Sequence, residues 1–84
     1  MKLVFADEAW DDYLHWQAHD PKLLTRLNGL IKECARTPFK GTGKPEPLKH
    51  TLSGYWSRRI NDEHRMVYKT EGDSLLLAQL RYHY

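Results

Sequence analysis

The sequence predicts an α+β domain in which a short N-terminal strand and two helices precede an antiparallel sheet. Apolar residues recur at helical spacing in the first half of the chain, and three β-type runs fill the second half. A Pro- and Gly-rich stretch lies between these halves. With 84 residues there is room for one hydrophobic core, so residues 1–84 are expected to form a single domain.

Composition indicates a folded protein of the cytoplasm. Hydrophobic residues make up 40% of the chain and charged residues 29%, as in ordinary globular domains. The single cysteine, Cys34, cannot form an internal disulfide, which suits a reducing compartment. No signal-peptide stretch develops, and no run approaches the ~20 apolar residues of a membrane span. Because no Cys/His spacing is typical of zinc, we expect no metal. We also expect no cofactor, and the lack of a long apolar run predicts no membrane association.

Charge is distributed unevenly around a net value of +2. Acidic residues gather early, at Asp7, Glu8, Asp11, Asp12 and Asp20. Basic residues gather later, at Lys40, Lys44, Lys49, Arg58, Arg59, Arg65, Lys69 and Arg81. This asymmetry favours an anionic partner for the C-terminal half. A solvated basic surface gives the same pattern, so charge alone leaves both interpretations open.

The first half of the chain predicts a strand followed by a helix. Residues 2–5 are an apolar run typical of a strand. Asp7 and Glu8 then supply the acidic first turn that the helix dipole favours. The expected buried stripe of this helix is Trp10, Tyr13, Leu14 and Gln17, flanked by Trp16.

A second helix is expected between two proline signals. Asp20 supplies an N-terminal cap, Pro21 suits the first helical position, and Thr37 with Pro38 ends the helix. Its apolar stripe is Leu24, Leu27, Ile31 and Cys34. Gly29 lowers helix propensity by about 1 kcal/mol relative to alanine, which indicates a close approach between the helices. Both stripes are expected to pack on a sheet.

The second half predicts a loop and then a three-stranded meander. Residues 37–50 hold three of the four prolines and should form the loop. Residues 52–60, 64–69 and 74–82 are β-type runs separated by turn signals. Tight turns centred on Asp62 and Gly72 would set the register of all three strands.

This register assigns each side chain to a face. The face expected to meet the helices carries Trp56, Ile60, Met66, Tyr68, Leu76, Ala78, Leu80 and Tyr82. The face expected to be open and cationic carries Tyr55, Ser57, Arg59, Arg65, Val67, Lys69, Gln79, Arg81 and His83. Arg58 and His64 fit the core face poorly, so we expect an edge, a bulge or a register shift near them. His15, His19 and His64 remain unassigned surface residues.

An open cationic face could bind phosphate, and with a base and an acid it could cleave RNA. Internal attack needs a base for the 2′-hydroxyl, cations for the transition state and an acid for the leaving 5′-oxygen. Glu46, fixed between two prolines, is the candidate base. Arg59 and Arg65 could hold the phosphate, and His83 could donate the proton. Each residue also has a simpler interpretation. Glu46 could be a solvated loop acid, Arg59 and Arg65 could be solubilising charges, and His83 could belong to a frayed terminus.

Four stretches together resemble a known family. K-P-E-P-L-K-H, L-S-G-Y-W-S-R-R-I, E-H-R-M-V-Y and the final R-Y-H-Y are similar to the YoeB toxins of the RelE/ParE toxin–antitoxin superfamily. The resemblance runs from end to end of the chain. It implies a microbial-ribonuclease-like fold and an mRNA endonuclease that works in the A site of the 70S ribosome. It also implies a YefM-like antitoxin partner and a homodimer.

The resemblance carries functional roles to matching positions. It implies that Glu46 is the general base, Arg65 the transition-state stabiliser, His83 the general acid and Tyr84 a residue that orients substrate. Substrate contacts are expected from Lys49, His50 and Arg59. Two alternatives stay open: a non-catalytic ParE-like toxin that inhibits DNA gyrase by binding, and a ribonuclease that needs no ribosome. The terminus should be held because Tyr82 faces the core.

Overall fold

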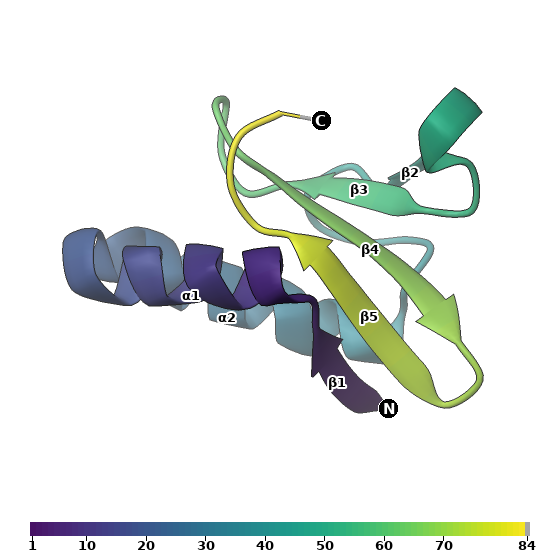
Figure 1. Ribbon diagram of the computed structural model, residues 1–84, viewed down its shortest axis with the longest axis horizontal. Helices are drawn as coiled ribbons and strands as arrows, with labels where there is room; N and C mark the ends of the chain where they lie inside the picture. The colour runs from purple at the N-terminus through teal and green to yellow at the C-terminus, as the bar shows by residue number, and fades with distance from the viewer. Residues whose placement is uncertain (84) are drawn as a thin grey trace.

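The computed structural model describes residues 1–83 as two helices and a five-stranded sheet. The elements are β1 (Lys2–Phe5), α1 (Asp7–His19), α2 (Pro21–Arg36), β2 (Glu46–Pro47), β3 (Trp56–Arg59), β4 (Arg65–Glu71) and β5 (Ser74–Gln79), with a 3₁₀ turn at His50–Leu52. Strand order is β1-β5-β4-β3-β2, with β1 parallel to β5 and the other pairs antiparallel. Both helices lie against one face of the sheet (Figure 1). The predicted α+β class is confirmed, and the N-terminal strand joins the sheet edge.

The stripe predicted for α1 is wrong at Trp10, Leu14 and Gln17, whereas Tyr13 packs against the core and the flanking Trp16 is buried. Ala9 and Trp16 are buried, whereas Trp10 and Leu14 are 47% and 40% exposed. The exposed Trp10 stacks on Tyr13, which itself packs against the core, with ring centroids 5.7 Å apart and planes at 6°. Aromatic residues three apart on a helix can contact each other without a sheet beneath them, so their spacing alone did not identify the buried face.

The prediction for α2 is confirmed at its start and in its stripe. Asp20 Oδ1 accepts a hydrogen bond from the Leu23 N–H (3.1 Å), and Pro21 occupies the first helical position. Leu27, Ile31 and Cys34 are buried, and Leu24 is partly buried. Gly29 does not mark a close approach, because a Cβ there would have no neighbour within 4 Å.

The register around Asp62 is as predicted, but the one around Gly72 is not. Glu71 pairs with Ser74, so the second turn is centred between Gly72 and Asp73. This half-residue difference turns Leu75 and Leu77 into the core and moves Leu76 and Ala78 off it.

A register shift between Val67 and Tyr68 then restores the predicted faces farther along. Val67 pairs with Gln79 and Tyr68 with Leu77, which leaves Ala78 as the extra residue of a bulge. Leu80 returns to the core as predicted. The irregularity lies here and not beside Arg58.

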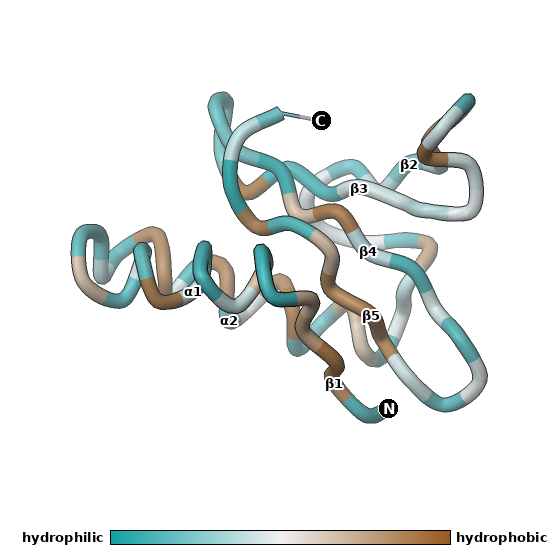
Figure 2. The backbone as a smooth tube through the Cα atoms, in the orientation of Figure 1, coloured by the Kyte–Doolittle hydropathy of each residue, from teal (hydrophilic) through white to brown (hydrophobic). Residues whose placement is uncertain are grey.

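Tyr82 is the last error in the predicted core. It is 57% exposed and has a φ of 65°, so the chain turns there and its ring leaves the core face. Apolar segments run along β1 and β5, whereas the described chain between β5 and the C-terminus becomes polar (Figure 2). Within residues 1–83, neither helix has the length and apolar character needed to span a bilayer.

Candidate active site

One row of side chains crosses the sheet on the face away from the helices. Glu46 of β2 pairs with Ser57 of β3, Ser57 with Val67 of β4, and Val67 with Gln79 of β5. Paired residues project to the same face, so the predicted base lies at one end of a continuous row. Ser57 and Val67 are 2% exposed, so the middle of this face is less open than predicted.

Arg59 and Arg65 form the neighbouring row and lie directly opposite each other. Like charges in this arrangement repel unless an anion lies between them. Arg59 is exposed, but Arg65 is 9% exposed, which corrects the prediction of an open position. The carbonyl oxygens of the β3–β4 turn contact one nitrogen of the Arg65 guanidinium.

Those carbonyl contacts share one nitrogen. Arg65 Nη1 donates to the carbonyl oxygens of Asn61 (2.6 Å) and His64 (3.1 Å), with Asp62 at 3.4 Å. Within the described residues 1–83, every hydrogen bond of this side chain uses Nη1. The bonds thus anchor one side of the planar guanidinium and orient its remaining nitrogens.

The segment that carries His83 is held against the same part of the sheet. Gln79 Nε2 donates to the carbonyl oxygens of Arg81 (2.7 Å) and His83 (3.3 Å). The Arg65 N–H donates to the carbonyl oxygen of Tyr82 (3.0 Å), which ties the segment to β4. In Figure 1 it curves back past the β3–β4 turn. The anchor is thus polar, not the buried Tyr82 ring that we predicted.

Four of the predicted site residues line two hollows on the surface. Glu46, Lys49 and His50 line a hollow of about 430 Å³ formed by residues 46–52. His83 lines another of about 380 Å³ with Gln79 and other residues. The structure brings Glu46 together with two of the three predicted substrate contacts, Lys49 and His50, but neither Arg59 nor His83 lines that hollow. Tyr84 lies outside the described residues.

Arg58 fixes the loop that leads to Glu46. Its fully buried guanidinium donates from Nη1 to Glu33 Oε2 (2.6 Å) and the Thr42 carbonyl (3.2 Å). From Nη2 it donates to the carbonyls of Lys40 (2.9 Å) and Thr37. Arg58 therefore does lie on the core face, where carbonyl oxygens and one carboxylate compensate its charge.

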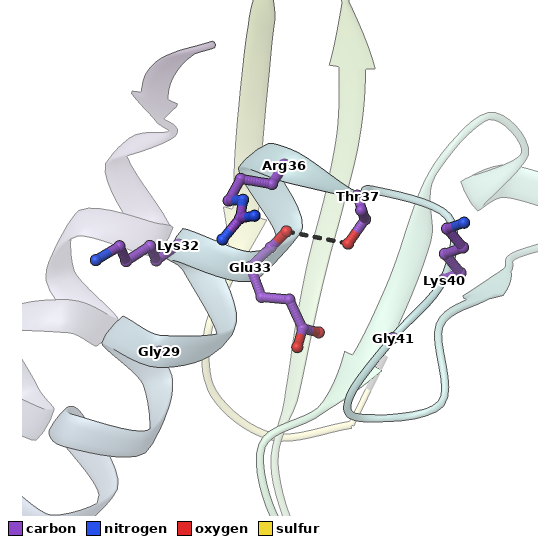
Figure 3. A pocket seen from close by; sticks show the side chains of 7 residues that line it. All are labelled: Gly29, Lys32, Glu33, Arg36, Thr37, Lys40 and Gly41. Carbon is purple, nitrogen blue, oxygen red and sulfur yellow. Dashed lines mark hydrogen bonds between the residues drawn. The ribbon is translucent and has the colours of Figure 1, made fainter.

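The carboxylate partner lies beside a surface hollow. Glu33 projects from α2 toward the loop that carries Lys40 and Gly41, where the hollow measures about 510 Å³ (Figure 3). Gly41 has a φ of 120°, which favours glycine, and a Cβ there would lie 2.5 Å from Glu33 Oε2. The close approach explains how Glu33 reaches both Arg58 and the loop.

Tyr68 and Gly43 complete the support of this loop. The Tyr68 hydroxyl accepts from Arg58 Nε (3.3 Å) and donates to the Pro38 carbonyl (2.6 Å). Burial raises the pKa of Tyr68 to about 12, so it keeps its proton at neutral pH. The Arg59 N–H then donates to the Gly43 carbonyl (2.7 Å), just before the chain enters β2.

Acid is expected to weaken this network through Glu33. The N–H and hydroxyl of Thr42, followed by Arg58, hold the pKa of Glu33 below its ordinary value of 4.5. The unfolded chain therefore takes up the proton first, so the stabilisation is present above pH 4.5 and lost as pH falls through the folded pKa. Urea unfolding of Glu33→Gln should show a weaker loss of stability in acid than the parent protein.

A matched control for this measurement is Glu71→Gln. Glu71 Oε2 lies 3.7 Å from Lys69 Nζ, but the Glu71 side chain is 70% exposed. An exposed pair of this kind contributes little, so the control should keep the acid dependence of the parent. Equal acid dependence in the parent and Glu33→Gln would contradict the prediction.

Sequence reasoning assigned no role to Gln79, Ser57 or His64. Gln79 and Ser57 were predicted on the same face as the site. Their polar side chains on that face could have indicated a role in the site. His64 gave no such indication, because its contacts depend on the path of the chain after β5. Among residues 1–83, no group of three His, Cys, Asp or Glu side chains is arranged to hold a metal ion.

Comparison with known proteins gives full-length matches. A family model described as "YoeB-like toxin of bacterial type II toxin-antitoxin system" matches residues 5–84. Toxin YoeB of Escherichia coli strain K12 is 61% identical over 84 residues, and Toxin YoeB of Streptomyces coelicolor is 57% identical, each covering all of both chains.

Solved structures agree with these matches. A YoeB/ParE toxin from Agrobacterium tumefaciens superposes with a TM-score of 0.97 at 51% identity, covering all of both chains. A heterotetrameric YoeB-YefM toxin-antitoxin complex from Staphylococcus aureus contains a chain with a TM-score of 0.91 at 41% identity, covering 100% of this chain and 98% of that one.

Proposed function

Because the chain belongs to the YoeB-like toxins of bacterial type II toxin–antitoxin systems, we propose that it is an mRNA endoribonuclease. It cleaves mRNA in the ribosomal A site and so inhibits translation. The observation that carries this proposal is the pairing of Arg59 with Arg65 beside the row that starts at Glu46 and ends at Gln79. An anion-binding pair next to a carboxylate supports phosphate chemistry.

The proposed reaction needs no metal and conserves all atoms. Glu46 takes the proton of the 2′-hydroxyl, and the 2′-oxygen forms a bond to phosphorus. Arg65 stabilises the charge that develops on the phosphate oxygens. The bond to the 5′-oxygen breaks as His83 gives that oxygen a proton, while Tyr84 orients the substrate. The products are a cyclic 2′,3′-phosphate and a 5′-hydroxyl.

Cationic side chains around the base would hold the RNA. Lys49 and His50 share the hollow with Glu46 and are proposed to contact phosphates of mRNA or ribosomal RNA. Arg59 is exposed and faces Arg65, so it is proposed to contact the scissile phosphate. Such contacts would add affinity without reading sequence.

The proposed partner in the cytoplasm is an acidic, YefM-like antitoxin. The Staphylococcus aureus relatives include a YoeB-YefM complex and a YoeB dimer, which supports an antitoxin partner and a homodimer here. An acidic antitoxin segment that folds across Arg59 and Lys49 would compete with RNA for the same positive charge.

Glu46→Gln tests the proposed base. The amide keeps the size of the side chain but cannot accept the proton, so single-turnover cleavage on programmed 70S ribosomes should fall by roughly 100-fold or more. The matched control Glu71→Gln alters an exposed acid at the far end of the sheet and should keep the parent rate. A Glu46→Gln protein with the parent rate would exclude Glu46 as the base.

Substrate changes separate the proposed function from its alternatives. A 2′-deoxy nucleotide at the cut site removes the attacking oxygen, so it should abolish cleavage, and undiminished cleavage would refute internal attack. Naked mRNA should resist the protein unless ribosomes are present. A Glu46→Gln variant that stays fully toxic in cells and blocks DNA supercoiling in vitro would instead favour the gyrase-binding alternative.

A further inference from the structure

Two side chains of α1 bind the backbone of Leu80, the residue that follows β5. Asp12 Oδ2 accepts a hydrogen bond from the Leu80 N–H (3.0 Å), and Trp16 Nε1 donates to the Leu80 carbonyl (2.9 Å). Both polar groups of one residue are thus satisfied by side chains from the opposite end of the sequence. The direction in which the segment 81–83 starts is therefore fixed.

His64 holds the next part of this segment. Its ring is 8% exposed and lies edge-on to Trp16, with ring centroids 4.7 Å apart. His64 Nδ1 accepts a hydrogen bond from the Tyr82 N–H at 2.8 Å. This bond requires Nδ1 to carry no proton, because a protonated ring nitrogen can only donate.

The other side of Tyr82 is held by the neighbouring residue. The Tyr82 carbonyl accepts from the Arg65 N–H (3.0 Å). Consecutive residues, His64 and Arg65, therefore bind the N–H and the carbonyl of one residue. Tyr82 has a φ of 65°, a left-handed conformation that a side chain disfavours, so these two bonds hold it where it would not stay by itself.

The β3–β4 turn orders both anchors together. Asn61 Oδ1 accepts from the N–H groups of Glu63 (2.9 Å) and His64 (2.8 Å). The Asn61 carbonyl also accepts from Arg65 Nη1 (2.6 Å). The turn thus fixes the anchored nitrogen of the Arg65 guanidinium and the ring that receives the Tyr82 N–H.

From this geometry we propose that His64 is a positioning residue, which sets the place of His83 relative to Arg65 by holding the Tyr82 N–H. The proposal rests on the proposed function, in which His83 is the acid and Arg65 the stabiliser. Without the acceptor, Tyr82 relaxes toward an ordinary φ and the next residue moves. A displacement of about 1 Å can cost ~100-fold in rate.

Three substitutions at His64 test the acceptor. His64→Asn places Oδ1 close to the position of Nδ1, His64→Gln places its oxygen one bond farther out, and His64→Leu has no acceptor. We expect His64→Leu and His64→Gln to lower kcat by at least ~tenfold with KM for programmed ribosomes within about twofold, and His64→Asn to recover most of kcat. His19→Leu, at an exposed histidine of α1, is the control and should keep the parent kcat.

Nuclear magnetic resonance gives a readout that does not depend on cleavage. The N–H···N bond should produce a scalar coupling between the Tyr82 amide nitrogen and His64 Nδ1. The Tyr82 and His83 amides should exchange with solvent faster in His64→Leu than in His64→Asn. If neither the parent protein nor any variant cleaves mRNA, the proposed function is wrong. Amide exchange still shows whether His64 holds the Tyr82 N–H.

Two outcomes would overturn the positioning role. One is equal protection of the Tyr82 amide in the parent and in His64→Leu. The other is equal kcat in His64→Asn and His64→Gln, a comparison that stays valid if His64→Leu fails to fold.

Discussion

Replacing Arg58 with methionine is expected to lower the free energy of unfolding by about 3–5 kcal/mol, because several acceptors around its buried guanidinium lose their donor and each buried group left unsatisfied costs roughly 1–3 kcal/mol. Arg58 is fully buried and donates to Glu33, Tyr68 and three loop carbonyls. Methionine fills a similar volume but satisfies none of these acceptors. A loss of this size is a large part of the stability of an ordinary domain.

The same substitution should also impair the site. The loop that Arg58 holds runs directly into β2, and its release would let Glu46 move while Arg65 and the segment after β5 stay in place. Urea unfolding followed by tryptophan fluorescence gives the stability, and cleavage measured well below the unfolding midpoint gives the effect on the site. Arg58→Lys should recover only part of either loss, because an ammonium cannot span acceptors on several sides.

A double substitution identifies which partners matter. If the ion pair dominates, Glu33→Leu combined with Arg58→Met should restore stability, since replacing both charges by apolar residues is often neutral. We expect no such recovery, because the carbonyls of Thr37, Lys40 and Thr42 remain without Arg58. Parent-like stability of the double variant would contradict the account given for the loop.

Local signals predicted the parts of the fold that local interactions determine. For α2, the Asp20 cap, the proline after it and the apolar stripe agreed with one another, and that helix was predicted correctly. In α1 the aromatic residues formed a second stripe that competes with the true one, and Trp10 was placed in the core by error. Spacing identifies a helix but cannot choose between two apolar faces.

The predicted register of the sheet depended on where the turns were placed. A small error in one turn changed which residues of β5 were predicted in the core. The turn at Asp62 was placed correctly, so Arg59 and Arg65 were predicted on one face with Ser57. The turn near Gly72 was displaced by half a residue, which exchanged Leu75 and Leu77 for Leu76 and Ala78. A bulge at Ala78 then returned Leu80 to the predicted face. No residue of β5 indicates this bulge in the sequence.

The contacts that position the C-terminal segment could not be predicted from periodicity. Its contacts come from Asp12 and Trp16 at the other end of the sequence and from His64, which looked like a surface residue. We predicted a hydrophobic anchor at Tyr82, whereas the structure uses hydrogen bonds to backbone groups. Such contacts join residues as many as 68 positions apart, so they follow from the fold and not from local pattern.

His83→Gln is expected to lower the rate of mRNA cleavage by roughly 100-fold to 10,000-fold while leaving the fold intact. His83 is exposed, and its bond to Gln79 uses the backbone carbonyl, which the substitution keeps. Glutamine keeps hydrogen-bonding groups but cannot give up a proton to the leaving 5′-oxygen. Thermal unfolding should match the parent protein.

A substrate with sulfur in place of the leaving 5′-oxygen tests this role directly. A thiolate leaves without a proton, because a thiol has a pKa of ~8.5, far below that of an alcohol. His83→Gln should then cleave the sulfur substrate within about tenfold of the parent rate, since the missing acid no longer matters. Glu46→Gln should stay slow on both substrates, because the 2′-hydroxyl still has to lose its proton. If sulfur rescues neither variant, His83 does not act as the acid, and its contribution must come from binding the phosphate beside Arg65.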